Sequence, residues 1–163
     1  MNSIVISPAR EDEWESAMEV AWRTFLKFEA PDYTREGTDN FLAFISGEQL
    51  YKMFLCGEFK VMVARDGERI IGVAALRAGC HVSLLFVDGQ YHRQGIGRKL
   101  VAALQQHFLA EGCVQLTVNA APYAVGFYEK LGFIKTDDMK TAGGIAYLPM
   151  RCMVRISPEA EYI

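Results

Sequence analysis

Apolar side chains in the first third of the chain recur at spacings of three and four. The stripe consists of Trp14, Met18, Ala21, Trp22, Phe25 and Phe28. This period predicts an amphipathic helix. Ser7-Pro8 suits its start, and Pro31 follows its end. A second helical region is expected over residues 34–55, with an interruption at Ser46-Gly47 that could divide it into two helices.

Short apolar runs bounded by turn residues predict strands. They lie at residues 4–6, 59–64, 69–76, 82–87 and 114–118, and two more are expected around Gly143-Gly144. The turn Asp66-Gly67 makes an antiparallel hairpin of the second and third runs. Residues 82–87 are almost unbroken in apolarity, as expected for a central strand buried on both faces. Helices are predicted at 99–109 and 123–131.

Length and composition indicate one folded unit. The chain has 163 residues, which suits a single domain over 1–163, and its 51% hydrophobic content is too high for a disordered chain. Seventeen basic and twenty acidic residues give a net charge of −3. This balance argues against a general binder of nucleic acid or of membrane surfaces.

Neither the four cysteines nor the N-terminal residues form a recognisable functional motif. Cys56, Cys80, Cys113 and Cys152 contain no C-x-x-C pair, so no zinc site and no metal are expected. The N-terminal residues lack the pattern of a signal peptide, and no apolar run approaches the roughly 20 residues of a membrane span. We therefore expect a reduced, cytoplasmic protein.

One loop has the composition of an anion site. A buried strand leads into Arg93, Gln94, Gly95, Ile96, Gly97 and Arg98, and a helix follows. The first amides of a helix have no partner within it, so they bind anions. Gly95 and Gly97 would let phosphate oxygens approach the backbone, and the two arginines add charge. The loop is expected to hold a pyrophosphate.

Several ligands could use such a loop. A dinucleotide site requires G-x-G-x-x-G, but Leu100 stands where the third glycine belongs, and the expected downstream acidic residue is absent. A nucleoside-triphosphate loop requires G-x-x-x-x-G-K-[ST], which is absent. The two glycines could also serve only a tight turn. Coenzyme A fits the loop better than the nucleotides do.

Two motifs together resemble the GNAT superfamily of acetyl-CoA-dependent N-acyltransferases. The family pattern, Gln or Arg, two variable residues and Gly-x-Gly or Gly-x-Ala, corresponds to residues 92–97, with His92 departing from the Gln or Arg position. Residues 116–119, Leu-Thr-Val-Asn, followed by residues 123–133, which include Tyr-Glu-Lys-Leu-Gly-Phe, look like the family's fifth strand and the helix after it. The likeness covers most of the chain, and residues 1–55 are the least diagnostic part.

The resemblance implies a fold and a cofactor site. The fold would be α/β, with a mixed, mostly antiparallel sheet of about six or seven strands and helices on both faces, and its fourth and fifth strands would splay apart. The pantetheine arm of acetyl-CoA would pair with the backbone of Leu85, Phe86 and Val87. Amides of residues 93–98 would hold the pyrophosphate, and Asn119 matches a position that bonds the pantetheine amides.

The resemblance also proposes catalytic groups. Tyr128 matches a tyrosine whose hydroxyl reaches the cofactor sulfur, where it would stabilise the departing thiolate. A general base is needed because a protonated amine cannot attack. Glu29, at the end of the first helix, and His81, at the start of the fourth strand, are the candidates, and each could equally have a structural role.

The predicted function is transfer of an acetyl group from acetyl-CoA to a primary amine of a small molecule or peptide. A non-catalytic acyl-CoA-binding or sensing module with the same fold remains the alternative, and a nucleotide-binding regulator is disfavoured by the missing motifs. The identity of the amine is not legible in the sequence. The resemblance also implies that the tail, residues 149–163, could pair across a homodimer.

Overall fold

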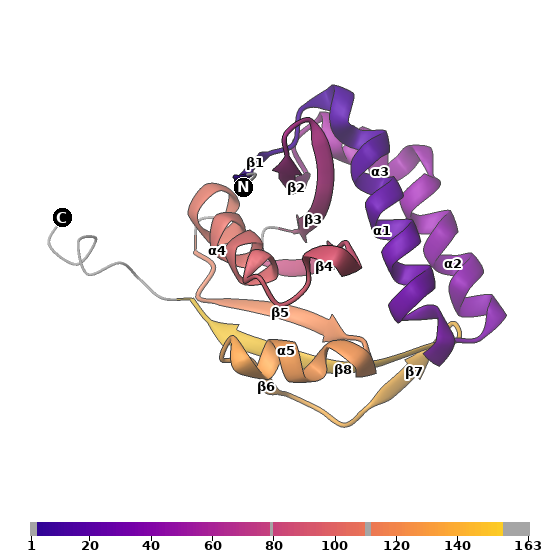
Figure 1. The fold of residues 1–163 in the computed structure, drawn as a ribbon. Coiled ribbons are helices and arrows are strands. Elements are labelled where there is room, and N and C mark those ends of the chain that lie inside the picture. Colours follow the sequence, from indigo (N-terminus) through magenta and orange to yellow (C-terminus); the bar gives the residue numbers. More distant parts are fainter. Residues whose placement is uncertain (1–2, 79, 110–111, 155–163) are drawn as a thin grey trace, which may run out of the picture.

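The computed structural model describes residues 3–78, 80–109 and 112–154, and Figure 1 shows their arrangement. The helices are α1 (Trp14–Phe28), α2 (Arg35–Ser46), α3 (Glu48–Leu55), α4 (Ile96–Phe108) and α5 (Val125–Lys130). The strands are β1 (Ile4–Pro8), β2 (Phe59–Asp66), β3 (Arg69–Arg77), β4 (His81–Val87), β5 (Gln115–Ala120), β6 (Ile134–Lys135), β7 (Lys140–Ala142) and β8 (Ile145–Met153). Single 3-10 turns are η1 (Glu11–Glu13), η2 (Ala30–Asp32), η3 (Gly89–Tyr91) and η4 (Pro122–Ala124).

The strands form one mixed sheet. Eight strands pair in the order β1-β2-β3-β4-β5-β8-β6, with β7 on β8, and the pairing is antiparallel everywhere except between β4 and β5. The predicted mostly antiparallel fold class is therefore confirmed. The sheet has more strands than the six or seven expected, because two-residue β6 and three-residue β7 are too short to leave an apolar run in the sequence.

Helices cover both faces of the sheet. Helices α1, α2 and α3 lie on one side and α4 lies on the other (Figure 1). Two apolar clusters result: one joins α1, α2 and α3 to inward-facing residues such as Phe59 and Val63, and the other joins α4 and α5 to the opposite face, including Met62 and Leu116. Adjacent residues Met62 and Val63 pack in different clusters, as the two-residue period of a strand requires.

The predicted helices are confirmed with shifted ends. The region 34–55 divides into α2 and α3 at Gly47, whose backbone is extended. Helix α1 begins at Trp14 rather than beside Pro8, because Pro8 still belongs to β1 and η1 intervenes. Helix α4 begins at Ile96, three residues before the predicted start, so the glycine loop itself opens the helix.

Strands β4 and β5 touch at only one end. Their parallel ladder contains two residue pairs, His81 with Thr117 and Val82 with Val118. The edge of β4 beyond Val82 therefore runs on without β5 beside it. This is the splay that the family resemblance implied, and it leaves backbone groups of both strands available to a ligand.

Additional contacts hold the closed end of the splay. The Thr117 amide donates to the Cys80 carbonyl at 3.0 Å, and Cys80 is joined to Cys113 by a disulfide. The expectation that the cysteines are all reduced is therefore wrong for this pair, whose separation of 33 residues gave no signal in the sequence. Cys56 and Cys152 are free thiols.

Strand β4 is irregular where it leaves β5. Leu76 of β3 lies opposite Val82 and Ala75 lies opposite Leu84, so Ser83 is an extra residue in a β-bulge. Along β4, buried residues alternate with half-buried ones. The prediction that this strand is buried on both faces is wrong, because its Ser83-Leu85-Val87 side borders the opening.

Other predictions concern the C-terminal tail, membrane-spanning helices and metal sites. Of the segment expected to pair across a dimer, residues 149–154 are described and 155–163 lie outside the described residues. No helix in the described part of the chain is long and apolar enough to cross a membrane. Among the same residues, no group of three or more His, Cys, Asp or Glu side chains could hold a metal ion.

Candidate active site

A small cavity of about 50 Å³ lies where β4 and β5 separate. Its lining comes from four regions: the end of α1, the β4 bulge, the end of β5, and the η4–α5 segment. The lining residues are Glu29, Val82, Ser83, Leu84, Leu85, Phe86, Val118, Asn119, Ala121, Ala124 and Tyr128. The predicted residues Glu29, Leu85, Phe86, Asn119 and Tyr128 are thus brought together from segments far apart in the chain.

Glu29 lies in an environment that raises the pKa of its carboxyl group. It is the C-cap residue of α1, half-buried, and no hydrogen bond or ion pair to its carboxylate is found within residues 3–78, 80–109 and 112–154. Burial raises the pKa of Glu29 to about 7. A carboxyl group with such a pKa exchanges a proton readily at neutral pH.

Tyr128 lies in the same cavity and is held rigidly. Its ring is buried and packs edge-on against Phe127 and Phe133, with ring centroids 5.3 and 5.2 Å away. Burial, and then the charge of Glu29, raise the pKa of Tyr128 above its usual value. The hydroxyl therefore keeps its proton at neutral pH and is available as a hydrogen-bond donor.

Tyr33 extends the site beyond η2. Burial raises the pKa of the Tyr33 hydroxyl, and the charges of Glu29 and Asp32 add to the effect. Its ring packs on Phe25 at 5.2 Å between centroids, and Phe25 is fully buried. Of these two aromatic residues, Phe25 belongs to the core, and Tyr33 is the one near enough to feel the Glu29 carboxylate.

The glycine loop opens α4 directly. Gly95 is the N-cap residue, with φ of 76°, and Arg93 also has a positive φ of 63°. A side chain at Gly95 would meet nothing within 4 Å, so its requirement is conformational. Arg93, Gln94, Gly95 and Arg98 are exposed. The loop thus presents free helix amides and two cationic side chains to solvent, which suits an anion.

The structure shows a packing requirement at Gly97. A Cβ atom at this position would lie 3.0 and 3.1 Å from two atoms of the Phe127 ring. The missing side chain therefore allows α4 to pack closely against α5. The family glycine pair combines one conformational and one packing requirement.

His92, which departs from the family pattern, is turned back onto the protein. Its Nε2 lies 2.6 Å from the Val87 carbonyl oxygen, so that nitrogen donates the hydrogen bond. The imidazole also packs on Phe28, which stacks on Tyr123, with centroids 4.8 and 5.3 Å apart. His92 thus ties the loop to the end of β4 and to α1.

A charge pair aligns α1 with the end of β4. Arg23 donates two hydrogen bonds to the buried Asp88, from Nε to Oδ1 at 2.9 Å and from Nη2 to Oδ2 at 2.6 Å. Such bidentate pairs have a defined geometry. Because Asp88 directly follows β4 and Glu29 follows α1, this contact helps to set where Glu29 lies relative to the opening.

His81 is not brought to the cavity. It lies at the closed end of the splay, where its Nδ1 is 2.8 Å from the Thr117 hydroxyl, and burial, with Arg77 nearby, lowers its pKa. Asn119, in contrast, is exposed and lines the cavity from β5. The two candidate bases are thereby separated: Glu29 lines the cavity together with Tyr128, and His81 does not line it.

These features fit coenzyme A. The fold offers strand edges at the β4–β5 opening for amide groups and a helix N-terminus for a diphosphate, in the order along β4 and α4 that a pantetheine arm followed by a pyrophosphate needs. Two side-chain cations at that N-terminus, Arg93 and Arg98, are exposed to solvent, where they can meet an anion. We therefore find the residues present compatible with this ligand.

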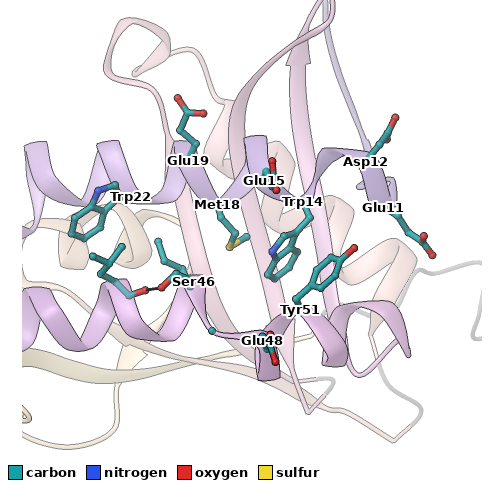
Figure 2. Close-up of a pocket in the computed structure, with 13 residues that line it drawn as sticks. Glu11, Asp12, Trp14, Glu15, Met18, Glu19, Trp22, Ser46, Glu48 and Tyr51 are labelled. Carbon is teal, nitrogen blue, oxygen red and sulfur yellow. Dashed lines mark hydrogen bonds between the residues drawn. The ribbon is translucent and has the colours of Figure 1, made fainter.

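A larger groove lies elsewhere, between α1 and the junction of α2 and α3. It has a volume of about 700 Å³, and Figure 2 shows Trp14, Met18 and Tyr51 between the helices with carboxylates around them. Trp14 stacks on Phe54 with centroids 4.9 Å apart and is almost fully buried. The floor of the groove is therefore part of the core, and none of the predicted site residues lines it.

Curated proteins with similar sequences share a name. Glucosamine 6-phosphate N-acetyltransferase 1 of Oryza sativa subsp. japonica is 34% identical over 55 residues, which cover 34% of this chain and 33% of that protein. Glucosamine 6-phosphate N-acetyltransferase of Trypanosoma brucei brucei is 31% identical over 84 residues, covering 45% and 57%. The chain thus spans from a third to just over half of these relatives.

Solved structures match over nearly the whole chain. A GCN5-related N-acetyltransferase from Rhodopseudomonas palustris superposes with a TM-score of 0.78 at 22% identity, covering 94% of this chain and 98% of the other. The PaiA N-acetyltransferase from Thermoplasma acidophilum, in complex with coenzyme A, gives 0.77 at 21%, covering 93% and 99%. A model of the acetyltransferase (GNAT) domain matches residues 29–154. The chain therefore belongs to the GNAT family of acetyltransferases.

Proposed function

We propose that this acetyltransferase moves the acetyl group of acetyl-CoA directly to a primary amine, with Glu29 as general base and Tyr128 beside the leaving sulfur. The observation that carries the proposal is that Glu29, with a pKa of about 7, and Tyr128 line one cavity at the β4–β5 opening. A base and a hydrogen-bond donor at one opening are the two side chains that amide formation from a thioester needs.

The cofactor would lie along β4 and the start of α4. Backbone groups of Leu85, Phe86 and Val87 would pair with the pantetheine amides, helped by Asn119 from β5. Amides of residues 93–98 would bind the pyrophosphate, with Arg93 and Arg98 beside it. The support is the early end of the β4–β5 ladder and the exposure of the loop. Acetyl-CoA supplies the activated acyl group.

Each side chain has one task in this mechanism. Glu29 removes the proton of the amine, directly or through one water, so that the neutral nitrogen can attack. A backbone amide of β4 near Phe86 would donate to the carbonyl oxygen. Tyr128 donates a hydrogen bond to the sulfur, and its raised pKa favours this role over complete proton transfer.

The acceptor class is a small-molecule or peptide amine. The names of the two curated relatives make amino-sugar phosphates the first compounds to test. A panel should also include polyamines, aminoglycosides and peptides with a free α-amino group. Release of free thiol from acetyl-CoA, with product masses confirmed by mass spectrometry, is the measurement. Binding of acetyl-CoA without thiol release for every amine would favour a non-catalytic module instead.

Tyr128→Phe separates the leaving-group role from packing. The variant keeps the ring between Phe127 and Phe133 and removes only the hydroxyl, so we expect kcat to fall on the order of 10-fold to 100-fold with little change in coenzyme A affinity by calorimetry. Tyr51→Phe, on α3 and outside the cavity, is the matched control. Unchanged turnover in Tyr128→Phe would remove this residue from the mechanism.

A further inference from the structure

Ser83 lines the cavity, and its side chain carries a polar group that the described protein does not use. Its Oγ is buried and has no hydrogen-bond partner within the described part of the chain, a property that only Thr24 Oγ1 shares there. A buried hydroxyl without a hydrogen-bond partner destabilises a folded protein. Thr24 lies on α1 and does not line the cavity, whereas Ser83 does. Of these two residues, Ser83 is the one that borders the space where a bound reactant could lie.

The position of Ser83 in the strand strengthens this reading. It is the extra residue of the β4 bulge, and it is the first residue of β4 after the last pair with β5, Val82 with Val118. A bulge changes the direction of a side chain relative to its neighbours in the strand. Ser83 therefore stands at the apex of the splay, on the strand expected to lie along the thioester arm.

The chemistry of the reaction leaves one atom without a side-chain partner. As the amine nitrogen bonds to the carbonyl carbon, its proton goes to Glu29, the carbon–sulfur bond breaks, and the electron pair leaves on the sulfur near Tyr128. During this exchange the carbonyl oxygen gains negative charge and requires donors. Glu29 serves the nitrogen and Tyr128 the sulfur, so the remaining hydroxyl of the cavity is matched to the oxygen.

We propose that the Ser83 hydroxyl donates a hydrogen bond to the acetyl carbonyl oxygen of bound acetyl-CoA and acts as a catalytic residue. This inference rests on the proposed function, because it assumes that the thioester lies at the β4–β5 opening. It explains why a hydroxyl that weakens the free protein is present in an otherwise apolar run of β4.

The test uses Ser83→Ala, with Ser83→Thr as the hydroxyl-retaining variant and Thr24→Val as the control that removes the other unpaired hydroxyl. The first readout is the infrared carbonyl stretch of acetyl-CoA labelled with ¹³C at the carbonyl and bound without acceptor. We expect it at lower frequency in the wild type and Ser83→Thr than in Ser83→Ala. The same frequency in all three proteins would overturn the proposal.

Kinetics and stability provide the second readout. Ser83→Ala should lower kcat on the order of 10²-fold with KM values nearly unchanged, while the free protein melts at the same or a higher temperature. Thr24→Val should show the same stability pattern with normal kcat. A Ser83→Ala variant that changes only KM, or only the preference between acetyl and propionyl donors, would contradict the oxyanion role. If the wild type transfers no acetyl group to any amine, the proposed function fails, and the infrared shift still tests Ser83.

Discussion

Glu13 and Glu29 occupy the two ends of one helix and have opposite environments. Glu13, the N-cap residue of α1, is 6% exposed and accepts hydrogen bonds from Arg65 Nε at 2.6 Å and from the Arg10 amide at 2.8 Å. The Arg65 hydrogen bond is the main cause that lowers its pKa. Glu29, the C-cap residue, is half-buried and forms no ion pair with any residue that the structure describes, and burial raises its pKa to about 7.

The comparison of Glu13 with Glu29 distinguishes a carboxylate that stabilises the fold from one suited to proton transfer. The helix dipole increases the difference in pKa between the two residues, because negative charge is favourable at a helix N-terminus and unfavourable at the C-terminus. Glu13 remains ionised and holds η1 against β2, where Arg65 lies. Glu29 sits near the balance between its charged and neutral forms, which suits a group that takes up and releases protons.

The largest expected effect comes from removing the ionisable group at Glu29. Glu29→Gln should lower kcat on the order of 10²-fold to 10⁴-fold and abolish the rise of kcat with pH, which in the wild type should have a midpoint at about pH 7. Steady-state rates between pH 5.5 and 9 measure both. Glu15→Gln, an exposed position on the same helix, is the control. A retained midpoint near 7 would assign the base to another residue.

Removing the charge of Glu13, at the N-terminus of α1, should lower stability rather than activity. Glu13→Gln leaves the Arg65 guanidinium, with a side chain only 11% exposed, without its counter-charge, and loss of one partner of a buried pair costs about 3–5 kcal/mol. Urea denaturation should show this decrease in the free energy of unfolding. The specific activity of the folded fraction should be unchanged, and a large loss of kcat with normal stability would contradict the division of roles.

The two carboxylates also predict opposite slopes of stability with pH. Glu29 binds its proton more tightly in the folded state, so its contribution decreases as pH rises from 4.5 to about 7. Glu13 has a lowered pKa, so its contribution is present above 4.5 and is lost as pH falls below that value. Glu29→Gln should therefore be more stable than the wild type at pH 8, by at most about 3 kcal/mol. Equal stability of the two proteins from pH 4.5 to 8 would show that burial does not perturb Glu29.

The smallest effect is expected from Arg10, the exposed ion-pair partner of Glu13. The Arg10 side chain is 68% exposed and lies 3.6 Å from Glu13. Because exposed ion pairs contribute about 0–1 kcal/mol, Arg10→Ala should change the free energy of unfolding by less than about 1 kcal/mol. Because salt screens exposed charges, this difference should be smaller at high salt than at low salt. A change as large as that of Glu13→Gln would mean that Arg10, not Arg65, is the main partner.

Much of the architecture was visible in local patterns. The 3.6-residue apolar stripe located α1, and Ser46-Gly47 located the break before α3. Short β6 and β7 were missed, because two or three residues carry no periodic signal. The disulfide was missed for a similar reason, since Cys80 and Cys113 are 33 residues apart and meet only when β4 and β5 pair.

The site was predicted in part. The glycine loop and Tyr128 were found through the family motifs, but the packing role of Gly97 depends on Phe127, which belongs to a different helix. Glu29 and His81 could not be ranked from the sequence, because each is a lone titratable residue near a helix or strand end. The structure puts Glu29 in the cavity and ties His81 to Thr117. The one available signal for Ser83 was a single polar residue within an apolar strand.

The sequence alone determined the order of the elements, the helix N-terminus suited to an anion and the family, because these depend on contacts between near neighbours and on short motifs. Only the tertiary structure decided which side chains share the opening between β4 and β5 and which carboxylate has a cation beside it. Such properties depend on burial and on charges brought from distant segments. Protonation is set by that environment, so two glutamates of one helix acquire different chemistry.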